Sequence, residues 1–398
     1  MKSEIAEKNI KIQAWINFLA GIVFLIPIVT LFYKFSGLSL LEIVLISNVT
    51  TFSVWIFELP TSVFADTLGR KKSLVISVIC NFLSALTILI FPSFGGFLGA
   101  AIFSGLYWSF WSGTGQAFLE ENLRVLGKTH EFGKKIGHFM SLERLAGIFT
   151  PLAAAGILKI FSENGYQILA ILDVIFALIL VFLTVQLREN FLFEKWKTFG
   201  ELFQKNYEIA KSALQNVFQN KNLRIFLIYR SLSSHVGFLF VISLPVLTEN
   251  GMQEYFGGIL TAIAGVAMLI TNKFTYKFAE KKSYHFAWVF STISQAVLLI
   301  FAGFFLKSWI FFAVIFVIFN FFEGIWMPAW NHVLVEQTKG IALATTRSVI
   351  FSVFALYITI GKQFLSFFPV SCALIGSGVF IILINIFLAR KILALRTT

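Results

Sequence analysis

Apolar segments long enough to cross a membrane recur along the whole chain. About 20 apolar residues in a helix span the hydrocarbon core of a bilayer, and the sequence contains twelve such stretches. They are residues 13–33, 39–64, 73–94, 96–118, 137–161, 166–187, 223–248, 255–276, 284–305, 309–331, 343–366 and 368–389. This pattern predicts an all-α membrane protein with twelve transmembrane helices.

The composition excludes the soluble alternatives. Of the 398 residues, 58% are hydrophobic and 13% charged, whereas a soluble domain carries roughly a quarter of its residues as charged side chains. A disordered chain needs the opposite composition. The two cysteines, Cys80 and Cys372, lie far apart inside apolar runs, so we predict neither a disulfide framework nor a metal site. We also expect no cofactor.

The first apolar segment is too long for the core of a signal peptide, and no small-residue cleavage site follows it. We therefore predict that it is a retained helix.

Lysine and arginine fall in alternate loops between the predicted helices. One set of loops holds clusters such as residues 70–72, 188–224 and 390–396, while the opposite set holds essentially Lys34, Lys159 and Lys307. Basic loops remain in the cytoplasm, so both termini are expected there, in a cell (inner or plasma) membrane. The net charge of +12 is thus an orientation signal, and we predict no nucleic-acid partner.

Residues 188–222 form the only long polar interval. They mix Lys and Glu with Phe, Trp and Leu at helical spacing, which predicts an amphipathic helix on the cytoplasmic face. A solvated linker is an equally good interpretation. Either way, the interval divides the chain into a six-helix bundle (1–190), a linker (191–222) and a second six-helix bundle (223–398).

The two predicted bundles share traces of a repeat. Lys71-Lys72-Ser73 precedes the third span and Lys281-Lys282-Ser283 precedes the ninth. Gly113 and Glu120-Glu121 in the fourth span have counterparts in Gly324 and Glu336 of the tenth. Two pseudo-symmetric six-helix halves are one of the repeat arrangements found in secondary transporters.

The strongest local motif lies between the second and third spans. Residues 58–72 read Glu-Leu-Pro-Thr-Ser-Val-Phe-Ala-Asp-Thr-Leu-Gly-Arg-Lys-Lys. Gly69 permits a tight turn, and Arg70 is able to hold Asp66 through charge-assisted hydrogen bonds. A merely basic loop explains Lys71 and Lys72 but not Asp66 or Gly69.

This stretch resembles the Gly-x-x-x-Asp-x-x-Gly-Arg-Lys loop of the major facilitator superfamily, with Ser62 in place of the first glycine. The resemblance implies the twelve-helix fold of that family and a secondary transporter rather than an enzyme. It also implies that four residues form a conformational latch, closed in one state and released in another: Asp66, Gly69, Arg70 and Lys71.

The resemblance extends to Trp111–Ala117 in the fourth span, which looks like bacterial permeases of the superfamily without assigned substrates. Two positions depart from the related patterns. Gly115-Gln116 stands where those permeases often carry an acidic pair, and Ser109 stands where drug/proton antiporters carry an arginine. Antiport is therefore expected to use other residues.

Six Asp, Glu and Arg residues lie well inside the predicted spans, where burial costs at least about 2.5–3.5 kcal/mol. These candidates for proton coupling or gating are Glu58, Glu143, Arg144, Asp173, Arg230 and Glu323. All except Asp173 fall roughly 10 Å from the cytoplasmic boundary at about 1.5 Å per residue. A layer of charges at one depth indicates a gate or a cavity floor, and static pairs between helices are an equally good interpretation.

The matching depths lead us to expect an ion pair between Arg230 and Glu323, with Arg144–Glu58 as the rival pairing. Glu42 and Lys362 lie near the outer ends of their spans, and we expect both to reach water.

The resemblance also implies that the first, fourth, seventh and tenth helices line a central cavity. The candidates for substrate contact on these helices are Tyr107, Trp108, Trp111, Gln116, His235, Trp326 and Trp330. Aromatic walls favour an amphipathic or lipophilic substrate, although large aromatic side chains also serve ordinary packing. His235 is either a proton carrier or a neutral hydrogen-bonded histidine.

No Gly-x-x-x-x-Gly-Lys-Ser loop is present, so the sequence does not indicate ATP-driven pumping. We predict proton-coupled export of a small amphipathic compound by a monomer that works by alternating access in a lipid bilayer. The alternatives are a lipid or lysolipid flippase of the same fold and a non-transporting receptor or scaffold.

Overall fold

The computed structural model describes residues 2–189, 199–337 and 343–395, all of them in helices, turns or short connections. No strand occurs in these ranges. The all-α prediction is therefore confirmed. The chain divides into two compact units, Met1–Ser36 with Val49–Tyr207, and Gly37–Asn48 with Glu208–Thr398.

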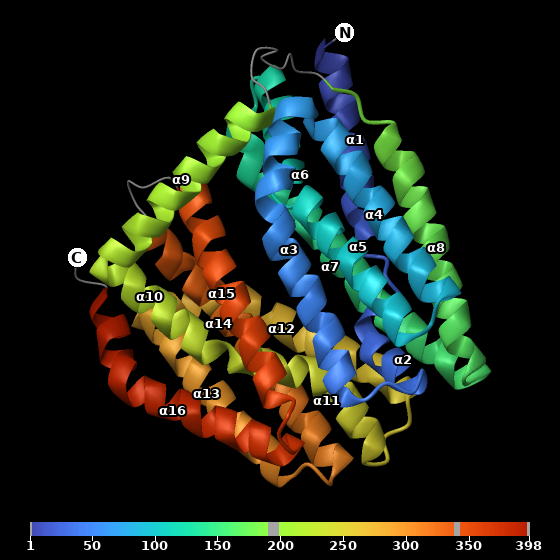
Figure 1. Cartoon of the computed structure of the whole chain (residues 1–398), viewed down its shortest axis with the longest axis vertical. Coiled ribbons are helices and arrows are strands. Elements are labelled where there is room, and N and C mark those ends of the chain that lie inside the picture. The colour runs from blue at the N-terminus through green and yellow to red at the C-terminus, as the bar shows by residue number, and fades with distance from the viewer. Residues whose placement is uncertain (1, 190–198, 338–342, 396–398) are drawn as a thin grey trace. The chain divides into compact units, whose positions relative to one another are not determined.

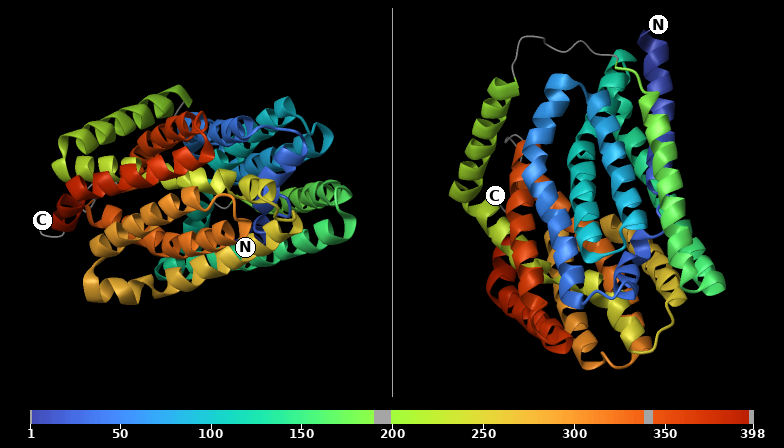
Figure 2. Two further views of the ribbon diagram at one scale, coloured as in Figure 1. Left: turned by 90° about the horizontal axis from the view of Figure 1, so that it is seen from below. Right: turned by 45° about the vertical axis from the view of Figure 1, so that its right-hand side comes forward.

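The first unit is built on α4, which packs between α5 and α8 (Figure 1), as the right-hand view of Figure 2 also shows. Its helices are α1 (Lys2–Ala20), η1 (Ile26–Ile28), α2 (Val29–Phe35), α3 (Leu40–Leu68, from residue 49), α4 (Arg70–Ile90), α5 (Phe94–Trp111), α6 (Thr114–Val125), η2 (Thr129–Glu131), α7 (Phe132–Phe161), α8 (Asn164–Val185) and the start of α9 (Phe199–Gln219). A buried apolar cluster joins α1, α4, α6 and α8 around Ile16, Val78 and Phe118.

The second unit is built on α13, which packs against both α14 and α16 (Figure 1). Its helices are the start of α3, most of α9, α10 (Lys221–Leu232), η3 (Ser233–Val236), α11 (Gly237–Glu249), α12 (Tyr255–Lys282), α13 (Tyr284–Phe304), α14 (Trp309–Gln337), α15 (Leu343–Leu365) and α16 (Val370–Ala394). Its buried apolar cluster centres on Phe226, Trp288 and Ala329.

Nine helical segments in the described ranges are long and apolar enough to cross a membrane, and two shorter apolar helices accompany them. The nine correspond to all the predicted spans except the first, fourth and eleventh. The first and fourth are each divided into two helices. The eleventh begins in residues whose side chains lie outside those described. The count of twelve stays a prediction.

Three of the four helices expected to line a cavity are interrupted. The first span breaks between Ala20 and Ile26, and the fourth breaks at Ser112-Gly113, where Gly113 has φ 71°. The seventh changes to a short 3₁₀ helix, η3, between α10 and α11. Such breaks leave backbone N–H and C=O groups without helical partners, and inside a membrane these groups need other ones.

The turns before α4 and α13 match in backbone conformation, but the predicted register of the repeat is wrong. Gly69 (φ 113°, ψ 142°) precedes α4, and Ser283 (φ 112°, ψ 156°) precedes α13 with nearly the same backbone conformation. Lys71-Lys72 therefore lies in the first turn of α4, whereas Lys281-Lys282 ends α12. The Lys-Lys-Ser match places the halves four residues out of step.

The helix predicted in the linker is α9, which covers residues 199–219; residues 190–198 lie outside those described.

Candidate functional site

The predicted latch lies at a turn of a single residue. Helix α3 continues through Leu68, Gly69 turns the chain with φ 113°, and α4 begins at Arg70. Only glycine adopts this backbone conformation without strain. Asp66 belongs to the last turn of α3, but its side chain lies outside the described residues, so its pairing with Arg70 stays a prediction.

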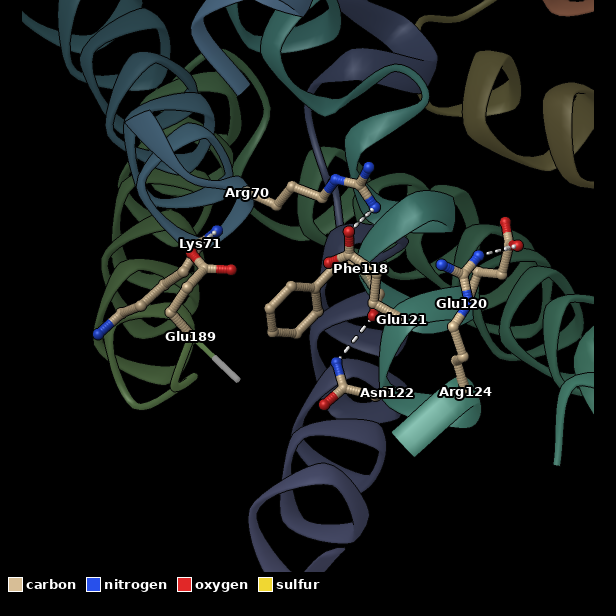
Figure 3. A network of polar contacts seen from close by, with 8 residues as sticks. All are labelled: Arg70, Lys71, Phe118, Glu120, Glu121, Asn122, Arg124 and Glu189. Carbon is tan, nitrogen blue, oxygen red and sulfur yellow. Dashed lines mark hydrogen bonds and ion pairs between the residues drawn. The ribbon is translucent and has the colours of Figure 1, made fainter. Parts of the chain in front are cut away.

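Arg70 forms an ion pair with Glu121 of α6 (Figure 3). The two side chains are 23% and 17% exposed, so water screens this pair less than a surface pair. Glu120, the neighbouring acid, forms instead an exposed pair with Arg124 at 3.1 Å.

Glu189, just beyond α8, accepts a hydrogen bond from the backbone nitrogen of Lys71 at 2.9 Å (Figure 3). Desolvation raises the pKa of Glu189, while this hydrogen bond and the nearby charges of Arg70, Lys71 and Lys72 oppose the rise. The Glu189 carboxylate thus offsets the positive charge at the start of α4, although its burial disfavours the charged form.

Asn9 of α1 joins the same end of the first unit. Its amide nitrogen donates to Asn122 Oδ1 (2.9 Å) and to the carbonyl of Arg188 (2.8 Å), and its amide oxygen accepts from the Arg188 nitrogen (3.0 Å). We call Asn9, Arg70, Lys71, Glu121, Asn122 and Glu189 the motif network. The sequence interpretation missed Asn9 and Glu189; polar residues next to apolar runs were the available signal.

Asp173 of α8 holds the break in the first span. Its two carboxylate oxygens accept hydrogen bonds from the backbone nitrogens of Phe24 (2.7 Å) and Leu25 (3.0 Å). On its other side, the break lies so close to α7 that a Cβ on Gly21 would meet the Glu143 carbonyl at 2.2 Å. The first span therefore bends where α7 and α8 together fix its backbone.

The break in the fourth span gathers several predicted site residues. Glu58 of α3 accepts a long hydrogen bond from Ser112 (3.4 Å). Tyr107 is buried against Trp108 and Trp111, with ring centroids 5.2 and 6.0 Å away, and Trp108 is 46% exposed. Gln116, in the first turn of α6, is also exposed.

Glu143 and Arg144 are neighbours on α7, and Arg144 is exposed. Within the described ranges Arg144 forms no ion pair with Glu58. The rival pairing is therefore wrong for this structure, because Glu58 turns to Ser112 at the helix break.

Arg230 lies in the last turn of α10, beside the break in the seventh span, and is only 6% exposed. Its guanidinium carbon lies 4.1 Å from the ring centroid of Trp326, 4.6 Å from that of Trp330 and 3.8 Å from that of Phe354. Cation–π attraction of this kind holds a desolvated guanidinium in place.

The predicted Arg230–Glu323 ion pair is wrong for this structure. Glu323 accepts a hydrogen bond from Gln295 of α13 at 2.8 Å, and no direct pair with Arg230 occurs among the described side chains. The two charges still interact through space. Three aromatic rings surround the guanidinium instead. The side chain of His235 lies outside the described residues.

Lys362 does not reach water as predicted, because it is only 6% exposed and donates a hydrogen bond to Ser47 at 3.0 Å. Next to it, Asn48 donates to Gln363, also at 3.0 Å. Glu42 accepts from the nitrogen and hydroxyl of Ser39 (2.8 and 2.7 Å), which caps the start of α3.

Across the described ranges, no three His, Cys, Asp or Glu side chains gather as a metal ion would require.

Comparison with known proteins agrees with this arrangement. The profile of the Major Facilitator Superfamily matches residues 12–362. Comparison with curated protein sequences gives no significant match.

Several solved transporter structures are similar to the chain over nearly its whole length. The nucleoside transporter NupG is 12% identical with a TM-score of 0.72, covering 99% of both chains. The xylose transporter XylE from E. coli is 14% identical with a TM-score of 0.68, covering 95% of this chain and 98% of its own. The POT family transporter PepTSo is 13% identical with a TM-score of 0.71, covering 99% of both chains.

At such low identity these likenesses establish the fold, and the profile match over most of the chain establishes the family. The chain belongs to the major facilitator superfamily.

Proposed function

We propose that this protein is a secondary active transporter that exports a small amphipathic or lipophilic compound by alternating access, coupled to protons. The observation that carries the proposal is the interruption of the first, fourth and seventh spans, each beside an ionisable side chain: Asp173, Glu58 and Arg230. Discontinuous helices with polar groups at the break are a common way for transporters to build binding sites inside the membrane. We place the protein in the plasma membrane as a monomer with cytoplasmic termini.

The latch is assigned to Asp66, Gly69, Arg70 and Lys71, and we extend it to the motif network. The Arg70–Glu121 pair and the Glu189 bond to Lys71 join the start of α4 to α6 and to the end of α8. Rearranging these helices would exchange such pairs, as domain movements in other proteins do.

Proton coupling is assigned to Glu58 and Glu323. Each hydrogen bond found for them comes from a neutral side chain, Ser112 or Gln295. Protonation of either carboxylate would therefore not take an acceptor away from a backbone N–H group. Asp173 instead binds two backbone nitrogens, and we assign it to holding the first break. Glu143 and Arg144 stay gate candidates.

The test is transport by purified protein in proteoliposomes, with an imposed pH gradient, internal pH recorded by a trapped dye and a panel of amphipathic compounds. We expect accumulation of at least one compound against its gradient, with proton movement in the opposite direction. Asp66→Asn should abolish this flux at normal expression, and Glu58→Gln or Glu323→Gln should uncouple it from pH. Glu120→Gln, in the exposed pair with Arg124, is the control.

Full flux in Asp66→Asn would contradict the latch. Unchanged pH-driven flux in both Gln variants would contradict the coupling assignment, and lipid scrambling without flux of any soluble compound would favour a flippase.

A further inference from the structure

Three aromatic side chains from two helices surround one buried positive charge in the second unit. We call Arg230 of α10, Trp326 and Trp330 of α14, and Phe354 of α15 the Arg230 box. Trp326 and Trp330 are four residues apart and so lie on one face of α14. Trp326 is buried, whereas Trp330 and Phe354 are partly exposed.

The box contains hydrogen-bond donors that lack acceptors. Arg230 Nε and Nη1 and the indole nitrogens of Trp326 and Trp330 are all buried without a hydrogen-bond partner. The indole nitrogen of Trp288 is also buried without a hydrogen-bond partner. The rings of Trp288 and Trp330 both pack on Phe226. Buried donors are normally paired, so donors in excess at one place indicate that an acceptor enters from elsewhere.

No protein group in the described part of the chain supplies that acceptor. Glu323 is the nearby acid, but it accepts from Gln295 rather than from the box. The indole N–H and the guanidinium are donor groups only. A ligand that fits must bring acceptors and little donor capacity.

We propose that the Arg230 box binds the acidic head of an amphipathic organic anion, a carboxylate or phosphate on an apolar body, as the transported substrate. This inference rests on the proposed transport function and specifies its substrate class. Charge-assisted hydrogen bonds from the guanidinium and two indole N–H groups hold the oxygens of the head, while the aromatic faces receive the apolar body. A sugar fits poorly, because each hydroxyl adds a donor to a wall that already consists of donors.

The first experiment compares matched ligands on purified protein in phosphatidylcholine nanodiscs. Three ligands share each apolar body (naphthyl, decyl or cyclohexyl) and differ only in the head group, which is a carboxylate, a neutral amide or an amine. A fourth ligand with the same body carries a phosphate ester. The melting temperature followed by circular dichroism reports binding, since a ligand of the folded state raises it. We expect stabilisation by the acid or phosphate of at least one body and none by its amide or amine.

The second experiment removes donors while keeping the shape of the box. Trp326→Phe and Trp330→Phe retain an aromatic ring and lose the N–H, and Arg230→Met removes the charge. We expect Arg230→Met to weaken acid binding by roughly tenfold or more, and each Trp→Phe change by several-fold. Arg224→Gln, an exposed arginine on the same helix, is the matched control and should bind as the wild type does.

The outcomes separate the box from the transport proposal. Equal stabilisation by acids and amides, no acid binding for any body, or wild-type acid binding in both Trp→Phe variants would overturn the box, even if Arg230→Met fails to fold. Acid binding that depends on the box without any flux would keep the box and refute transport. If phosphatidylglycerol in the nanodiscs competes with the acids, the anionic head belongs to a lipid, and the anion site stands with a lipid as its cargo.

Discussion

The carboxylate of Asp173 in α8 accepts a hydrogen bond from the backbone nitrogen of Phe24, 149 residues earlier in the chain, at 2.7 Å. A second bond from Leu25 uses the other oxygen. A new helix turn begins at Ile26, and the N–H groups before it have no helical acceptor. One acid in the sixth span therefore stabilises the break in the first.

We expect Asp173→Leu to lower the free energy of unfolding by about 2 kcal/mol or more, because two partly buried N–H groups lose their acceptors. Asp173→Asn keeps one acceptor and should lose less. Thermal melting in detergent measures both, with Glu163→Gln, an exposed acid before the same helix, as the control. Wild-type stability in the Leu variant would show that the break does not need Asp173.

Gly69 and Ser283 share a backbone conformation that strains any residue with a Cβ, so substitutions at the two positions should have opposite effects. Gly69→Ala should destabilise by about 1–3 kcal/mol. Ser283→Gly relieves strain but loses the cap on the Phe286 nitrogen, which costs only a few tenths of a kcal/mol, so it should not destabilise. Melting temperatures of the two variants check this, and a fall in both would refute the shared turn geometry.

Glu189 makes stability depend on pH in a defined direction. Its pKa is raised in the folded protein, mainly by desolvation, so the folded state binds the proton more tightly than the unfolded chain does. Its contribution is therefore most favourable at low pH and declines as the pH rises through the raised value. Glu189→Gln removes this decline.

We expect Glu189→Gln to melt above the wild type at pH 8, with the difference vanishing near pH 4. Glu120→Gln serves as the control. A difference that grows as the pH falls would reverse the assigned sign.

The coupling energy of Arg70 with Glu121 should exceed that of Glu120 with Arg124. The first pair joins α4 to α6, whereas the second lies within α6. Both pairs are in contact, but the first is largely buried and the second is mostly exposed. A double-mutant cycle with Gln at each position should give about 1 kcal/mol or more for the first pair and about 0.3–0.5 kcal/mol for the second. Equal coupling energies would mean that burial of Arg70 adds nothing.

Replacing Lys362 tests whether its buried charge serves stability or transport. Its ammonium group donates to Ser47 and has no ion pair in the described part of the chain. Desolvation of a single buried charge costs several kcal/mol, and an apolar side chain of similar length removes that cost. We therefore expect Lys362→Met to melt at or above the wild-type temperature, and a flux assay on the same variant reports any role in transport. A lower melting temperature would show that the lysine is structural.

The helices could be predicted from sequence because transfer into a membrane depends on one segment at a time. Apolar length marks a span by itself, and the nine spans found lie where apolar stretches were expected. The turn at Gly69 was equally local, because only glycine takes that conformation without strain. Ser283 had no such signal, because a serine does not by itself indicate a positive φ, and a chance Lys-Lys-Ser triplet set the wrong register.

Which charges meet was decided by tertiary structure. Depth in the membrane placed Arg230 beside Glu323 and Arg144 beside Glu58, but depth says nothing about the rotation of a helix or about where it breaks. Packing turns Arg230 toward Trp326 and Phe354, and the break at Ser112 provides Glu58 with a different partner. The sequence alone indicated the family through one motif and nine of the spans through their apolar length, since both are properties of single segments. The partners of Asp173, Arg230 and Lys362 required the folded structure, because each comes from a helix distant in sequence and is fixed only by how the helices pack.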